Sequence, residues 1–139
     1  MYQPTAKDGH YVRVYNKTRE RFVATHAAVA DGYFSRLVGL LGTTRRWARP
    51  GQGLWIVPSH GVHTIGMLYA LDLIFLDRQH RVVEVVEKIR PFRISPVSFK
   101  ADSVLELPVT TVSSTETQVG DQLEISPAPA ADSAVMLSP

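Results

Sequence analysis

The chain has 139 residues, of which 45% are hydrophobic and 20% charged, as expected for one globular domain with its own core. Its continuous apolar runs are only a few residues long, far short of the roughly 20 residues that a membrane-spanning helix requires. The chain contains no cysteine, which excludes disulfides, thiolate metal ligands and thiol nucleophiles.

The amino-terminal residues M-Y-Q-P-T-A-K-D-G-H lack the basic patch and apolar stretch of a secretory signal. We therefore expect a cytoplasmic protein, or a periplasmic or exported one if a leader was removed. These first ten residues are polar and rich in turn formers, which predicts a flexible N-terminus over 1–10.

The net charge of +2 conceals an asymmetry: residues 1–100 carry fifteen bases and seven acids, or +8, whereas 101–139 carry six acids and no base, or −6. Because the bases are dispersed among apolar residues, we expect the two parts to attract each other in the folded domain, and a positive face for an anion is the alternative. The one basic cluster, R-R-W-A-R at 45–49, precedes Pro50 and Gly51 and indicates a solvated loop. We expect no nucleic-acid partner.

Strands dominate the pattern. Segments rich in β-branched, aromatic or other apolar residues are bounded by turn formers, and the long Thr- and Ser-rich segment at 110–118 supports one weak helical turn at most. Between the second and third strands, Asp31 can cap a helix of about three turns that ends at Gly42. The predicted strands are Tyr11–Tyr15, Arg21–Thr25, Leu54–Val57, Leu71–Leu76, Arg81–Ile89, Ser103–Leu107 and Gln122–Ile125.

From Ser126 onward the composition changes to Pro, Ala and Ser, which cannot offset the entropy of ordering. We therefore predict a single β-rich domain over 11–125 and a disordered tail over 126–139. The fold class is mainly β, with one or two short helices.

Five motifs in a fixed order are similar to a known family: F-S-R-L-V-G-L-L-G, V-H-T-I-G-M, A-L-D-L-I-F-L-D, L-E-L-P and V-G-D-Q-L. Over about residues 20–125 the chain resembles the uncharacterised bacterial and archaeal family called domain of unknown function 192, or uncharacterised protein family 0127. The resemblance implies a compact sandwich or jelly-roll-like barrel of short strands. It implies no reaction.

Carried over position by position, the resemblance marks seven polar residues: Arg36, His63, Thr64, Asp72, Asp77, Glu106 and Asp121. Family members commonly have Cys where this chain has Ser59, and aromatic residues where it has Ile65 and Gly66. Asp77 and Asp121 stand beside turn residues, so turn hydrogen bonds explain both without a function.

Asp72 lies among Leu71, Leu73, Ile74 and Phe75, where a carboxylate is costly unless a partner compensates its lost hydration. Arg36 and His63 are the natural partners, and such a pair would tie the helix to the sheet or bind a polar ligand. The candidate binding residues are Arg36, Ser59, His63, Thr64 and Asp72.

The sequence contains two further constellations of reactive residue types. His60 and His63 are candidate ligands for a divalent metal, with Asp72 or Glu106 beside them, but positions i and i+3 of a strand face opposite ways. We therefore expect no metal and no other cofactor. Ser59, His63 and Asp72 contain the residue types of a hydrolytic triad, but no nucleophile elbow surrounds the serine.

The sequence thus favours a non-enzymatic, monomeric module that binds a small polar molecule or a protein partner at a cleft with His63 and Asp72. One alternative is an enzyme that uses His63 as general acid or base, with or without a metal, on a small hydroxylated or carboxylated substrate. The other is an accessory domain of a cell-envelope assembly.

Overall fold

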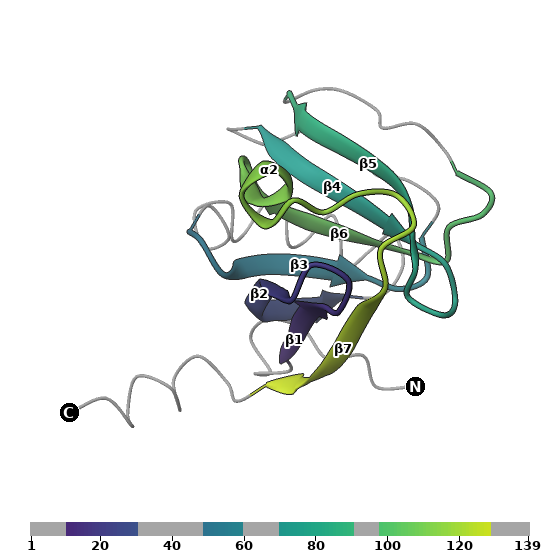
Figure 1. Ribbon diagram of the computed structural model, residues 1–139, viewed down its shortest axis with the longest axis horizontal. Coiled ribbons are helices and arrows are strands. Elements are labelled where there is room, and N and C mark those ends of the chain that lie inside the picture. Colours follow the sequence, from purple (N-terminus) through teal and green to yellow (C-terminus); the bar gives the residue numbers. More distant parts are fainter. Residues whose placement is uncertain (1–10, 31–48, 60–69, 91–97, 129–139) are drawn as a thin grey trace.

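The structure is a computed structural model, and it describes residues 11–30, 49–59, 70–90 and 98–128 (Figure 1). These residues form strands and one short helix. The elements are β1 (Tyr11–Asn16), β2 (Arg21–Ala30), β3 (Gln52–Ile56), β4 (Leu71–Leu76), β5 (Val82–Ile89), β6 (Ser103–Pro108), α2 (Thr111–Thr115) and β7 (Leu123–Ala128).

All the described strands belong to one seven-stranded sheet with the order β5-β4-β6-β3-β2-β1-β7. Every neighbouring pair is antiparallel except β2 and β3, which run parallel. The sheet is strongly twisted and remains unclosed, because its outer strands approach each other only at an isolated bridge between Arg81 and Gln122 (Figure 1). The predicted mainly β class is confirmed; the jelly-roll arrangement is not, since the described strands form one sheet.

Both faces of the sheet carry an apolar core. We call them the Leu105 face, which includes Ile74, Leu105 and Val112 of α2, and the Leu54 face, which includes Leu54 and Leu73. Two neighbouring interior strands, β4 and β6, are buried at every position. This burial explains why the segment at Leu71–Leu76 shows no simple alternation of apolar and polar residues.

The strands predicted from sequence are all present; β4 has the predicted bounds, and the other strands differ at one end or both. β2 continues to Ala30, five residues past its predicted end, and β3 begins at Gln52. β7 runs from Leu123 to Ala128 in register with β1, so residues 126–128 belong to the sheet and not to the predicted tail. Pro127 is tolerated there because an edge strand does not need every N–H.

After β6, where the sequence allowed one weak helical turn at most, the structure has α2, which is only five residues long. The predicted helix from Asp31, the N-terminus over 1–10 and the tail beyond Ala128 lie outside the described residues.

Candidate functional site

Asp72 is a fully buried carboxylate on the Leu105 face, opposite Leu107 of β6. Its Oδ1 accepts the backbone N–H of Lys88 at 2.9 Å, and its Oδ2 accepts that of Val112 at 2.9 Å. Lys88 has a φ of 55° at an irregularity in the pairing of β4 and β5. Asp72 therefore joins β4 to both β5 and the start of α2.

These partners differ in kind from the expected ones. The sequence suggested a basic side chain, whereas the contacts described for Asp72 come from backbone N–H groups. Arg36, His60, His63 and Thr64 lie outside the described residues, so their place in a site stays a prediction.

Ser59 lies at the opposite end of β4 from Asp72. Its N–H donates to the Asp102 carbonyl, and the Asp102 N–H donates to the carbonyl of Leu76, the last residue of β4. Leu76 is four positions along the strand from Asp72, which is roughly 13 Å. One imidazole cannot bridge that span, and this argues against the triad of Ser59, His63 and Asp72.

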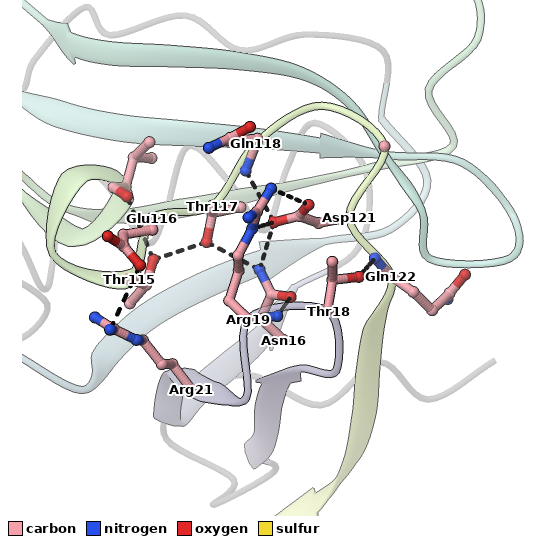
Figure 2. A network of polar contacts seen from close by, with 12 residues as sticks. Asn16, Thr18, Arg19, Arg21, Thr115, Glu116, Thr117, Gln118, Asp121 and Gln122 are labelled. Atoms are coloured by element: carbon pink, nitrogen blue, oxygen red, sulfur yellow. Dashed lines mark hydrogen bonds and ion pairs between the residues drawn. The ribbon is translucent and has the colours of Figure 1, made fainter.

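Asp121 is the centre of a polar network that Figure 2 shows. Its Oδ2 accepts Arg19 Nε at 3.0 Å, Asn16 Nδ2 at 2.9 Å and the Gln118 N–H at 3.0 Å, while its Oδ1 accepts Arg19 Nη2 at 3.1 Å. The turn after β1 is thereby fixed to the turn before β7. The predicted turn hydrogen bond is present, but it is the smaller part of the role of this residue.

The hydrogen bonds also set the charge state of Asp121. Burial acts to raise the pKa of this carboxyl, but the bonds from Arg19, Asn16 and the Gln118 N–H outweigh it, so the pKa lies below its usual range. The same bond raises the pKa of Arg19. Asp121 is therefore an anion in the folded state, and its two oxygens already accept four hydrogen bonds.

Asp77 behaves as predicted. Its Oδ1 accepts the backbone N–H groups of Gln79 and Arg81, each at 2.9 Å, within the turn that joins β4 to β5. This is the local bonding that favours Asp in turns.

A second group of polar residues crosses the Leu54 face, and we call it the polar row: Glu106, Gln52, His26 and Tyr11. Glu106 of β6 is opposite Leu54, which places Gln52 diagonally beside it on β3. Gln52 is opposite His26 of β2, and the His26 and Tyr11 rings meet edge to face with centroids 6.2 Å apart. The row therefore spans four neighbouring strands.

Two atoms of the polar row lack a hydrogen-bond partner within the described part of the chain. They are Gln52 Oε1 and His26 Nε2, and both are buried although their residues are only half-buried. A buried polar atom left without a partner costs about 1–3 kcal/mol. Such atoms are normally matched by ordered water or a ligand.

The backbone holds this part of the row in place. The Gly51 carbonyl accepts the N–H groups of Thr25 and His26 at 2.8 and 2.9 Å. Gly51 has a φ of 86°, and a Cβ there would lie 2.8 Å from Thr25 Oγ1. The positive φ and the close approach both favour glycine here, and the Gly51 carbonyl fastens the loop before Gln52 against β2 next to His26.

Sequence reasoning named Glu106 but not Tyr11, His26 or Gln52. The alternation of β2 would have placed His26 on the same face as Ala28 and Ala30, had the strand been extended past Thr25. Among the described residues no group of three or more His, Asp or Glu side chains is arranged to hold a metal ion. No helix in the described segments is long and apolar enough to cross a membrane.

The arrangement of the strands has counterparts among solved structures. A protein of unknown function from Novosphingobium aromaticivorans matches with a TM-score of 0.67 at 18% identity, over 82% of this chain and 83% of that chain. A protein described as a putative transcription regulator from Sinorhizobium meliloti matches with a TM-score of 0.67 at 24% identity, over 83% and 92%. At these identities the likeness concerns the fold alone.

Sequence relatives place the chain more narrowly. It is 29% identical over 115 residues to a UPF0127 protein of Thermococcus sibiricus, covering 78% of this chain and 71% of the relative. It is 32% identical over 102 residues to a UPF0127 protein of Pyrococcus abyssi, covering 69% and 82%. The model of the family DUF192, described as Uncharacterized ACR, matches residues 14–125. The chain therefore belongs to the DUF192 family, as the resemblance of its five motifs implied.

Proposed function

We propose that this protein is a non-enzymatic binding module for a small polar ligand, and that the ligand binds at the polar row. The observation that carries the proposal is the pair of buried atoms Gln52 Oε1 and His26 Nε2, which have no hydrogen-bond partner in the described part of the chain. A ligand that donates to the glutamine oxygen and bonds to the imidazole would remove the cost of leaving both unmatched.

The composition of the row favours a polar ligand over an apolar one. Glu106 supplies a carboxylate among apolar neighbours, opposite Leu54 and Leu73. Apolar walls with a few fixed polar groups are typical of small-molecule sites. The half-buried rings of Tyr11 and His26 lie at the far end of the row and offer a surface on which a ligand can pack.

The five candidate binding residues named from the sequence have different roles in this proposal. Asp72 serves the fold through its two backbone partners, so we do not assign it to ligand. Ser59 lies at the other end of β4. Arg36, His63 and Thr64 remain proposed ligand residues on the strength of the sequence.

The test is an NMR titration of the ¹⁵N-labelled full chain with sugars, carboxylates, amines and phosphates. We expect saturable shifts of the Gln52 side-chain amide and the His26 imidazole with one class of compound. The Gln52→Met variant keeps the length of the side chain without its polar end, and should weaken that response about tenfold, the value of one hydrogen bond of about 1.4 kcal/mol.

Gln118→Met is the matched control, because that side chain is exposed, and it should bind as the wild type does. Absence of any saturable shift at the polar row would contradict the proposal. So would a response that survives unchanged in Gln52→Met.

A further inference from the structure

The Leu105 face contains a second pair of buried polar atoms, at the end of the sheet where β5 and β7 approach each other. Trp55 Nε1 and Ser103 Oγ are both buried and have no hydrogen-bond partner among the residues that the structure describes. Ser103 is 1% exposed. An indole N–H can only donate and a hydroxyl can both donate and accept, so one small molecule can satisfy the two together.

The strand register places these two atoms on the same face. Trp55 is opposite Leu105, and Ser103 lies two residues along β6 from Leu105, which makes Trp55 and Ser103 diagonal neighbours. Ser103 is opposite Leu76 of β4. Diagonal neighbours have Cα atoms about 7–8 Å apart, within reach of a long aromatic side chain.

His80 fixes the direction of the indole. The rings of Trp55 and His80 meet edge to face, with centroids 5.5 Å apart and an interplanar angle of 86°. Trp55 of β3 thus meets a residue of the turn between β4 and β5, although β6 and β4 follow β3 in the order of the sheet.

The turn at His80 is itself held firmly. The His80 N–H donates to the Asp77 carbonyl at 3.0 Å, and its carbonyl accepts the Leu123 N–H at 3.0 Å. His80 and Trp55 are both half-buried, whereas Trp55 Nε1 and Ser103 Oγ are buried atoms. We call the contacting rings of Trp55 and His80 the aromatic rim.

We propose that Trp55 Nε1 and Ser103 Oγ bind one small hydroxylic molecule, either water or a small alcohol, beneath the aromatic rim formed by Trp55 and His80. The oxygen of that molecule accepts from the indole N–H and exchanges a hydrogen bond with the serine hydroxyl. Buried waters of this kind typically have two to four polar partners. The site is on the opposite face of the sheet from the polar row and does not depend on the proposed function.

The experiment uses the full chain with Trp47→Phe, which leaves Trp55 as the only indole. In one arm, NMR cross-relaxation between water and the Trp55 Nε1–H is measured. In the other, ethanol is titrated while the same signal is followed. A long-lived water that ethanol does not displace assigns the site to water, and a saturable ethanol shift assigns it to small alcohols.

Ser103→Ala removes the hydroxyl and should abolish the water cross-peak or weaken the ethanol response about tenfold. Ser126→Ala, at an exposed strand position, should change neither. An indole N–H without long-lived water or saturable ethanol response would overturn the proposal. A higher urea midpoint for Ser103→Ala would also overturn it, because it would show that the buried hydroxyl has no partner in the native protein.

Discussion

The Asp121 network and the polar row contain similar chemical groups in opposite states. Around Asp121, a carboxylate, an amide, a guanidinium and backbone N–H groups satisfy one another (Figure 2). In the polar row, an amide oxygen and an imidazole nitrogen are buried with no partner in the described part of the chain. The network connects turns, whereas the row lies in the middle of a sheet face.

The difference separates structural polar groups from candidate functional ones. A saturated network gains its stabilisation when the chain folds and has little capacity left for a ligand. A buried atom that remains unmatched has a cost that only a bound molecule or water removes. Burial of a carboxylate therefore does not identify a site, and Asp72 illustrates this as clearly as Asp121.

The largest effect should come from Asp72→Ala. This change leaves the Lys88 and Val112 N–H groups without their acceptor, and we expect a loss of about 3 kcal/mol of unfolding free energy. Urea denaturation measures it. Asp102→Ala, at a half-exposed carboxylate, is the control and should change little. A loss below about 1 kcal/mol for Asp72→Ala would mean that Asp72 is not structural and would return it to the candidate ligand residues.

The second largest effect should come from Asp121→Asn. We expect a loss of about 2 kcal/mol of unfolding free energy at pH 7, because an amide cannot accept all the hydrogen bonds that converge on the carboxylate. The pKa of Asp121 is lowered in the folded state. Its stabilisation is therefore complete above the unfolded pKa of about 3.9 and is lost as the pH falls through the lower folded value.

The gap in urea midpoint between wild type and Asp121→Asn should accordingly narrow as the pH falls below about 4. A gap that stays constant down to about pH 2 would show that the negative charge of Asp121 contributes nothing, and would weaken the contrast between the network and the polar row.

Arg78→Ala should have the smallest effect. The guanidinium is 85% exposed and its Nε lies 4.0 Å from Asp102 Oδ1, and exposed pairs of this kind contribute about 0.3 kcal/mol or less. Thermal unfolding at low and high salt measures the change. A loss of about 1 kcal/mol of unfolding free energy would indicate that exposed ion pairs stabilise this fold as well as the buried networks do.

Much of the fold could be predicted because its strands follow from local patterns of apolar and turn-forming residues in the sequence. Apart from Asp72, Leu71–Leu76 is apolar on both faces, and its bounds agree with the prediction. The far half of β2 was missed because Ala27, Ala28 and Ala30 have weak strand propensity, and parallel pairing with β3 keeps them in the sheet. Composition predicted a tail from residue 126. β7 continues there instead, because pairing with β1 holds its Pro and Ala residues at the edge of the sheet.

The site was harder to predict because it depends on register. The sequence shows that Asp72 needs partners, but only the irregular pairing at Lys88 determines which groups supply them. Likewise, Gln52, His26 and Tyr11 come from three separate strands, and no spacing along the chain brings them together. Their relation appears only when β2 and β3 are aligned in parallel.

The pairing of β1 with β7 determines when the protein can finish folding. β1 is the first described strand and β7 the last, and they lie side by side from Tyr11 to Asn16. During synthesis the β1–β2 hairpin must therefore wait, with one edge uncovered, until residues 123–128 have left the ribosome. Contacts so distant in sequence form slowly, and an uncovered edge invites pairing with other chains. We therefore expect the free edge of β1 to remain open to pairing with other chains until β7 has emerged.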